Sequence, residues 1–285
     1  MKHREASFYA PNNASLYYQS WEPETPARAI LLLVHGLAEH SGRYRELAEY
    51  FITAGFAVFA FDQEGHGKSD GVRGHIDRFS NYTSALETFT DEVREQNPGT
   101  PIFLVGHSMG GLISAATLVT RQSRFAGCVL SGAAVKAVDE PPRWLLFIGR
   151  MLSVLLPKMG QLQLDASGVS RDPDVVQRYI SDPLVYTGKI SARCVTELFN
   201  AMENLRAAAH KITLPILIMH GGEDSLAATE GSRILHEKIS SDDKTLIVYD
   251  GLYHEIFNEP ERHQVMADMK NWLNDRLGED RRAIA

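Results

Sequence analysis

The sequence predicts an α/β protein built on a mostly parallel central sheet. Short apolar runs alternate with helical patterns along most of the chain, which is typical of a parallel sheet covered by helices. A serine flanked by glycines also stands between one of these runs and a helical pattern. The chain has 285 residues, of which 44% are hydrophobic, so it is long enough for a substantial core in one large domain or one domain with an insertion.

The strands of this sheet are predicted from continuous apolar runs, because a parallel strand is buried on both faces. The six clearest runs are residues 29–34, 57–61, 102–105, 128–130, 216–219 and 245–249. Two N-terminal stretches, 6–9 and 15–21, are expected to be edge strands joined by a turn at residues 11–13. Helical patterns occupy residues 43–54, 79–95, 112–119, 228–239 and 261–277.

One region breaks this alternation. Residues 138–210 contain no convincing central strand, and the region is far longer than the dozen or so residues that a crossover needs. We therefore expect a helical cap at 138–210, inserted into a core made of residues 1–137 and 211–285. The alternative is a set of ordinary crossover helices.

Composition narrows the choice of partner and compartment. The formal net charge of −7 argues against a nucleic-acid partner. Cys128 and Cys194 lie in apolar stretches and form no Cys-x-x-Cys pair, which favours two buried thiols in a reducing, cytoplasmic compartment. The N-terminal residues lack the apolar segment of a signal peptide, and no run of 18 apolar residues occurs, so neither a leader nor a membrane span is expected.

Ser108 is the predicted nucleophile. It is the serine of a G-x-S-x-G motif that follows the apolar run 102–105 and precedes the helical pattern 112–119. In such a sharp turn the serine adopts strained backbone angles, and Gly106 and Gly110 remove side chains that would collide as strand and helix approach. The motif arises by chance in roughly one chain in ten of this composition, so its place between strand and helix carries the prediction.

The base and acid are predicted from chain order. In a fold with this elbow, the acid and then the histidine follow the serine along the chain. His254 comes just after the predicted strand 245–249, and Asp224 comes after the strand 216–219, with Glu223 as an adjacent alternative acid. Carboxyl ends of parallel strands are where such sheets place catalytic groups. His220 also ends a strand, but it precedes the acid and is therefore not expected to be the base.

The oxyanion of an acyl-transfer intermediate needs two hydrogen-bond donors. One is expected to be the backbone amide of Met109, which follows the nucleophile. The other is expected to be the amide of Leu37, because His35 and Gly36 directly follow the apolar strand 29–34. Together these residues predict an α/β-hydrolase fold with a Ser108–His254–Asp224 triad that needs no metal and no organic cofactor.

Five segments of the sequence resemble the monoacylglycerol lipases and their lysophospholipase-like relatives. The resemblance covers most of the chain, and the H-G-x-x-E-H-S-G-R-Y string is the most particular to that family. Ala38 departs from the glycine that many members carry. The five segments are residues 35–44 (HGLAEHSGRY), 61–69 (FDQEGHGKS), 106–111 (GHSMGG), 181–184 (SDPL) and 249–254 (YDGLYH).

The resemblance implies further site residues. It places Glu39, Arg43 and His107 near the glycerol end of the substrate, with Tyr179 of the cap as a further residue there. For Glu39 and Arg43 the alternative is a structural pair that stabilises the loop.

The resemblance also implies a cap helix that docks on membranes. The segment from Trp144 to Leu156 fits this role, because Arg150 is its only charged residue. It is too short to span a bilayer but suits an interface. A buried cap helix is the alternative.

The function expected from the triad and the resemblance is hydrolysis of a lipid ester: a monoacylglycerol is cleaved to a fatty acid and glycerol through an acyl-enzyme. Lysophospholipase or general carboxylesterase activity on the same triad is the close alternative, and a non-catalytic ligand receptor is a more distant one. Activity is expected to fall as His254 becomes protonated, below roughly pH 6.5. The sequence gives no indication of the oligomeric state.

Overall fold

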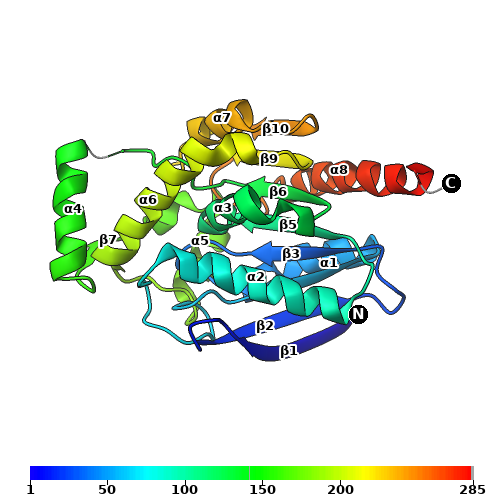
Figure 1. Cartoon of the computed structure of the whole chain (residues 1–285), viewed down its shortest axis with the longest axis horizontal. Helices are drawn as coiled ribbons and strands as arrows, with labels where there is room; N and C mark the ends of the chain where they lie inside the picture. Colours follow the sequence, from blue (N-terminus) through cyan, green and yellow to red (C-terminus); the bar gives the residue numbers. More distant parts are fainter. Residues whose placement is uncertain (141, 284–285) are drawn as a thin grey trace.

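The computed structural model describes residues 1–140 and 142–283, and it contains an eight-stranded central sheet in the order β1-β2-β4-β3-β5-β6-β9-β10 (Figure 1). The strands from β4 to β10 run parallel to their neighbours, and β2 runs antiparallel to both β1 and β4. The sheet strands are β1 Lys2–Tyr9, β2 Ser15–Glu22, β3 Ala29–Val34, β4 Phe56–Phe61, β5 Ile102–His107, β6 Gly127–Ser131, β9 Ile216–Gly221 and β10 Lys244–Tyr249.

This mostly parallel sheet confirms the predicted fold class. All six predicted central runs lie within strands, and β3 begins and ends where the sequence places it. The largest difference is β1, which begins four residues earlier than expected. Its additional residues, from Lys2 to Glu5, are polar and exposed on the outer edge of the sheet, so they carry no apolar pattern although they pair with β2.

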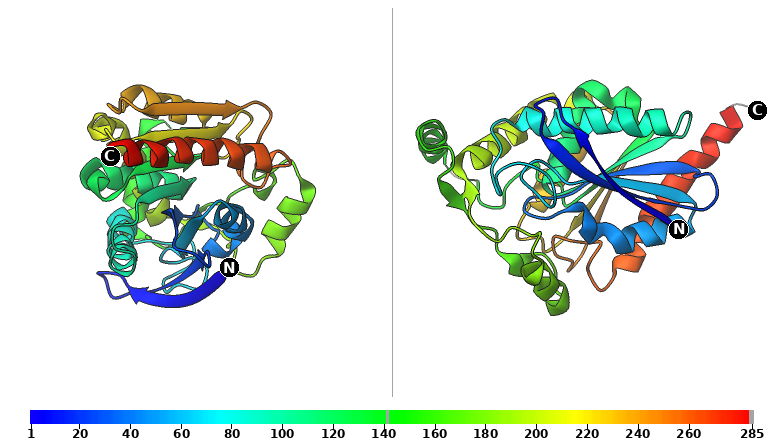
Figure 2. Two further views of the ribbon diagram at one scale, coloured as in Figure 1. Left: turned by 90° about the vertical axis from the view of Figure 1, so that its right-hand side faces the viewer. Right: turned by 90° about the horizontal axis from the view of Figure 1, so that it is seen from below.

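Helices cover both faces of the sheet (Figures 1 and 2). Side chains alternate between the two faces of β3: Ile30 and Leu32 join the core beneath α2, α3, α6 and α7, whereas Leu31 and Leu33 join the core beneath α1 and α8. A 3₁₀ turn at Ser41–Tyr44 precedes α1, where the sequence predicted one continuous helix. The helices are α1 Arg45–Thr53, α2 Phe79–Gln96, α3 Met109–Arg121, α6 Ala192–Ala208, α7 Thr229–Lys238 and α8 Arg262–Ala283.

The segment between β6 and β9 lies beyond the carboxyl ends of the central strands (Figure 1). In its described residues it contributes no strand to the central sheet. It contains α4 Arg143–Leu155, α5 Pro173–Ser181 and α6, which packs on α4 as well as on α2 and α3. It also contains an antiparallel pair, β7 Gly160–Leu162 and β8 Ile190–Ser191, which is too short to produce a recognisable alternation in the sequence.

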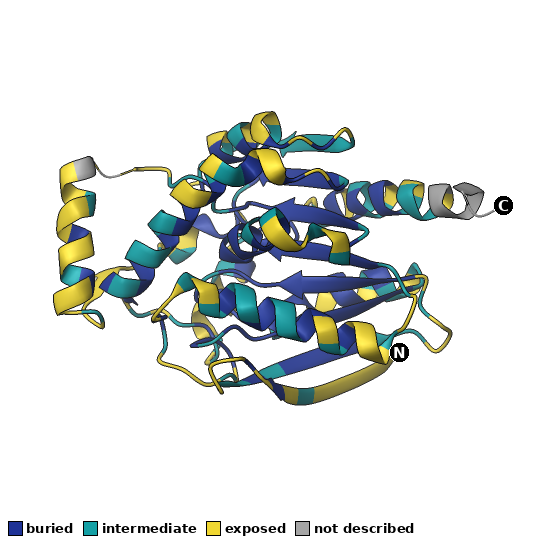
Figure 3. Ribbon diagram, in the orientation of Figure 1, coloured by how far each residue is buried: buried dark blue, intermediate teal, exposed yellow. Residues whose placement is uncertain are grey.

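Helix α4 stands at the edge of this segment with most of its surface open (Figure 3). Its small residues Gly149 and Ser153 are buried, whereas Trp144, Phe147 and Val154 are 65%, 62% and 67% exposed. Within the described ranges, no helix combines the length and the apolar character needed to cross a bilayer.

Candidate active site

Ser108 occupies the turn between β5 and α3, as predicted. Its backbone angles are φ 54° and ψ −119°, a strained conformation for a residue with a side chain. A Cβ atom on Gly110 would lie 2.0 Å from the Val34 carbonyl oxygen, and one on Gly106 would lie 2.6 Å from the Gly110 carbonyl oxygen. Both positions therefore require glycine for the helix to approach the sheet this closely.

Asp224 and His254 follow β9 and β10 and meet at the same edge of the sheet. His254 Nδ1 lies 2.6 Å from Asp224 Oδ2, and both side chains are buried. This hydrogen bond places the proton on Nδ1 and leaves Nε2 as the basic atom. His254 and Ser108 line one cavity. The alternative acid, Glu223, is exposed to solvent.

The electrostatics of this pair favour a charged imidazole. Burial by itself would lower the pKa of His254, but the Asp224 carboxylate outweighs it, with smaller contributions from Glu255 and Glu39, and raises that pKa above its usual value. Burial would raise the pKa of Asp224, yet the two imidazoles of His254 and His220 hold it well below the usual range. The structure therefore places protonation of His254 at a higher pH than the 6.5 expected from the sequence.

His220 makes a contact that chain order did not predict. Its Nε2 lies 3.0 Å from the same Oδ2 of Asp224 that bonds to His254, and its Nδ1 lies 2.7 Å from Ser232 Oγ. The Oδ1 atom of Asp224 accepts the amides of Leu226 and Ala227. The carboxylate is thus held from several sides, and His220 contacts the acid and not the cavity.

The loop after β3 is held at Gly36, the residue that precedes Leu37. His35 Nδ1 donates to the Gly36 carbonyl oxygen at 2.8 Å, and the Gly36 amide donates to Glu39 Oε1 at 2.6 Å. Burial lowers the pKa of His35 to about 4, so the ring stays neutral and its Nε2 accepts the Gln63 amide. Leu37 consequently lies in a fixed loop, which is what an oxyanion donor requires.

Met109 is the second of the two predicted oxyanion donors. It is the first residue of α3, and amides in the first turn of a helix have no intrahelical partner. Both Leu37 and Met109 line the cavity that contains Ser108. The N-terminal end of α3 also carries the positive end of the helix dipole, which favours a developing negative charge at this place.

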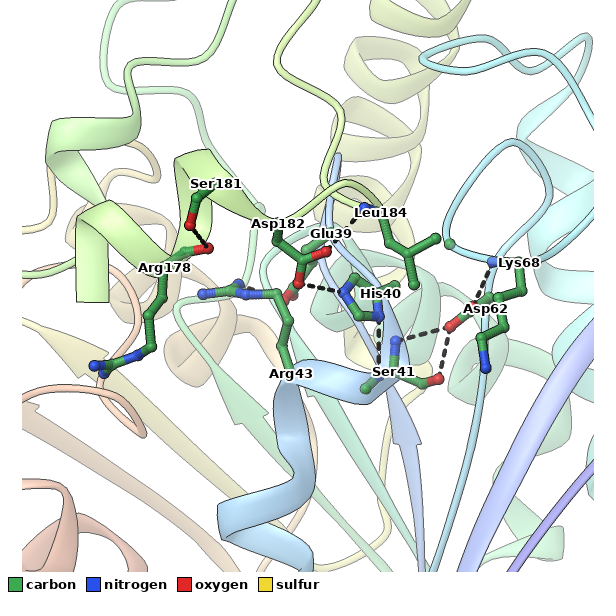
Figure 4. Close-up of polar contacts among 12 residues, drawn as sticks. Glu39, His40, Ser41, Arg43, Asp62, Lys68, Arg178, Ser181, Asp182 and Leu184 are labelled. Atoms are coloured by element: carbon green, nitrogen blue, oxygen red, sulfur yellow. Dashed lines mark hydrogen bonds and ion pairs between the residues drawn. The ribbon is translucent and has the colours of Figure 1, made fainter. Parts of the chain in front are cut away.

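The outer half of the same loop is bonded to two other segments (Figure 4). His40 Nε2 lies 2.9 Å from Asp182 Oδ2, so the loop is joined to the segment between β6 and β9. Ser41 donates its amide and its hydroxyl to Asp62 Oδ1, at 2.8 and 2.6 Å, and the Lys68 amide donates to Asp62 Oδ2. Three of the family-like strings are thus in direct contact, although they are far apart in the sequence.

The residues implied by the resemblance lie around the polar end of the cavity. Glu39, His107 and Tyr179 line it together with Ser108. Arg43 Nη1 donates to Glu39 Oε2 at 2.7 Å, and its guanidinium lies 4.6 Å from the centre of the Tyr179 ring. The His107 ring lies 4.7 Å from the His254 ring, and burial lowers the pKa of His107 to about 4.

Glu255 is the main residue of this region that the sequence reasoning missed. Its carboxylate forms a two-pronged pair with Arg43, with distances of 2.6 and 2.7 Å, and it lines the cavity next to His254. Its place beside the predicted base was the only signal in the sequence, and that place says nothing of which way the carboxylate points.

The rest of the cavity is largely apolar. A second cavity of about 490 Å³ adjoins it beneath α4. The described ranges show no group of three or more His, Cys, Asp or Glu side chains arranged to hold a metal ion. The walls common to both cavities are formed by Ala137, Leu162, Leu164, Asp165, Val195, Phe199 and Leu226.

Comparison with known proteins gives the family of this chain. The family described as serine aminopeptidase, S33, matches residues 25–261. A monoacylglycerol lipase of Mycolicibacterium smegmatis is 38% identical over 96% of this chain and 98% of its own length. Human monoglyceride lipase is 34% identical over 92% of this chain and 87% of its own length.

A solved structure supports the same relationship. The crystal structure of Paleococcus ferrophilus monoacylglycerol lipase has a TM-score of 0.81 and 35% identity, and the match covers 97% of this chain and all of that one. Because the family match and these relatives span nearly the whole chain, the protein belongs to the monoacylglycerol lipase-like α/β-hydrolases of the S33 serine hydrolase family.

Proposed function

We propose that this protein hydrolyses monoacylglycerols to a fatty acid and glycerol, with Ser108, His254 and Asp224 as its catalytic triad. The observation that carries the proposal is the 2.6 Å bond between His254 and Asp224 beside Ser108, at the polar end of an apolar cavity. The sequence relationship to monoacylglycerol lipases supports the choice of substrate.

The proposed reaction has two steps. Ser108 Oγ attacks the ester carbonyl carbon while His254 Nε2 takes its proton, and the amides of Leu37 and Met109 stabilise the negative oxygen. The imidazolium then protonates the departing glycerol oxygen, which leaves an acyl-serine ester. Water activated by His254 attacks this ester, the fatty acid is released and Ser108 regains its proton.

The polar side chains around Ser108 divide into two proposed roles. Tyr179 and His107 line the cavity beside the reacting atoms and are proposed to contact the glycerol end of the substrate. The carboxylate of Glu39 bonds to the Gly36 amide, the Tyr44 hydroxyl and Arg43. Since these polar atoms are engaged within the protein, we assign Glu39 and Arg43 to holding the loop.

Residues 138–210 are proposed to act as a cap that covers the acyl chain. Apolar residues of this segment form much of the wall shared by the two adjoining cavities, and the second cavity lies against α4. The exposed apolar residues of α4, including Trp144, Phe147 and Val154, suit contact with a lipid surface. The exposure of these side chains speaks against the alternative of a buried cap helix.

The experiment that tests the proposal measures fatty-acid release from matched oleoyl substrates: a monoacylglycerol, a lysophosphatidylcholine and a diacylglycerol. We expect a strong preference for the monoacylglycerol that is lost in Ser108→Ala. A preference for the lysophospholipid, or cleavage only of short activated esters, would keep the mechanism and overturn the substrate. Full activity in Ser108→Ala would overturn the mechanism.

A further inference from the structure

Glu255 forms a two-pronged ion pair between the loop that contains Leu37 and the loop that contains His254. Its Oε1 and Oε2 atoms accept separate hydrogen bonds from Nη1 and Nη2 of Arg43, at 2.6 and 2.7 Å. Both side chains are largely buried. Two parallel bonds between a guanidinium and a carboxylate fix the distance and the orientation of both groups.

Further hydrogen bonds connect Arg43 to Gly36, the neighbour of the predicted oxyanion donor Leu37. Arg43 Nη1 also donates to Glu39 Oε2, and the other oxygen of Glu39 accepts the Gly36 amide. Gly36 directly precedes Leu37 in the chain. A continuous series of bonds therefore runs from Glu255, the residue after His254, to the amide of Gly36, the residue before Leu37.

Two further hydrogen bonds hold Glu255 in place. Its amide donates to the Val169 carbonyl oxygen at 2.8 Å, and its Oε2 accepts from Asn258 Nδ2 at 2.8 Å. Burial would raise the pKa of Glu255, but the Arg43 guanidinium holds it below the usual value. The carboxylate is therefore ionised at neutral pH, and it lies in the wall of the cavity that contains Ser108 and His254.

We propose that Glu255 is a positioning residue of the ester hydrolysis: its paired carboxylate fixes the Leu37 loop against the His254 loop, and its charge stabilises the imidazolium of His254. This inference rests on the roles proposed above for Ser108, His254 and Leu37. The effect on the Leu37 loop follows from geometry, because an oxyanion donor that is displaced stabilises the transition state much less. The effect on the imidazolium follows from the buried negative charge next to His254 in the chain.

The test compares Glu255→Gln with the wild-type enzyme, using 4-nitrophenyl butyrate, whose hydrolysis does not depend on a preference for glycerides. We expect kcat to fall by roughly tenfold or more while KM changes by less than about threefold. The acid limb of kcat/KM should move to lower pH by about 0.5 unit or more, because the imidazolium loses a negative neighbour. Asp224, Glu39 and His107, which also act on the charge of His254, are not substituted in this variant, nor are His220, which contacts Asp224, and Arg43, which loses its ionised partner.

The matched control is Glu259→Gln. Glu259 is also buried, lies five positions after His254 and pairs with an arginine, accepting the amide and Nε of Arg171 at 2.7 and 2.6 Å. We expect this variant to lose stability without moving the acid limb. Glu255→Asp, which keeps the charge, should restore the position of the limb.

The position of the limb does not depend on the amount of active enzyme, so partial misfolding leaves the result readable. A fall in activity without a shift of the limb, equal to that of Glu259→Gln, would show a merely structural role and overturn the proposal. If Glu255→Gln yields no folded protein, Arg43→Lys removes the two-pronged pair, and an unchanged kcat in that variant would overturn the proposal. Persistent activity in Ser108→Ala is a separate outcome, which would overturn the proposed function itself.

Discussion

The loops around Ser108 and the helix α4 differ in how their side chains are bonded and exposed. Around Ser108 the residues that hold the loops are bonded to other parts of the chain: Asp224 contacts two imidazoles and two amides, and Gly36 is bonded through both its amide and its carbonyl oxygen. In α4 large apolar side chains face solvent, and the described polar contacts with α6 are those of Arg150 and a hydrogen bond from the Thr196 hydroxyl to the Gly149 carbonyl oxygen. This difference fits the two proposed roles, a firmly bonded region for the chemistry and an exposed apolar surface for contact with lipid.

Asp224→Asn should produce the largest effect, because it removes the negative charge that contacts His254. The amide retains the shape of the carboxylate but no longer stabilises the imidazolium, and it favours the wrong tautomer of His254. We expect kcat to fall by about 10⁴-fold with little change in the far-UV circular dichroism spectrum. A loss of less than tenfold would mean that Asp224 is not the acid of the triad, and Glu223→Gln would then be the variant to measure.

The pH profile of the wild-type enzyme tests the electrostatics of the same region. The base is active when neutral, and the structure raises the pKa of His254 above its usual value. kcat/KM should therefore fall as the pH decreases through a value above 6.5, by about tenfold for each unit below that pKa. A limb well below pH 6.5 would show that burial outweighs Asp224, and a flat profile from pH 5 to 8 would contradict the role of His254.

The surface of α4 should matter only when the substrate is part of a lipid surface. Replacing Trp144 and Phe147 with serine removes exposed apolar area that has no partner in the structure, so stability should change little. We expect release of oleate from monoacylglycerol in vesicles to fall by roughly tenfold, while hydrolysis of dissolved 4-nitrophenyl butyrate stays within about twofold.

The control for this prediction is Tyr9→Ser. Tyr9 is 72% exposed at the end of the edge strand β1, outside the segment that contains α4. It should leave both activities unchanged. An equal effect of the Tyr9 and α4 substitutions on vesicles would indicate general surface hydrophobicity and no docking by α4.

The sequence predicted the features that are local or that follow a fixed order along the chain. Continuous apolar runs gave the central strands, and the elbow places Ser108 where the motif predicts. Chain order and the positions after two predicted strands selected His254 and Asp224, with Glu223 as the alternative acid, and the structure brings Asp224 into contact with His254.

Contacts between distant segments could not be predicted in the same way. Arg43 and Glu255 are separated by 212 positions, and His40 and Asp182 by 142. Each of these side chains could equally lie in solvent as far as its neighbours in the sequence show. Which of them pair depends on how the loops at the carboxyl edge pack, and this is decided by the whole sheet and the segment above it.

Ala38→Gly should produce the smallest effect and concerns the firmly bonded region alone. Ala38 has a φ of +68°, a conformation that costs a residue with a Cβ atom about 1 kcal/mol or more, and its carbonyl oxygen accepts the Tyr186 amide at 2.8 Å. Glycine relieves this strain but has more conformational freedom in the unfolded chain, which offsets about 0.4 to 1 kcal/mol of the gain. We expect a free energy of unfolding equal to or up to about 1 kcal/mol above that of the wild type in urea denaturation. If the substitution instead lowers both stability and kcat, the strain at Ala38 is needed to hold Leu37 in place, and the rigidity of this loop depends on the Cβ atom as well as on the bonds to His35 and Glu39.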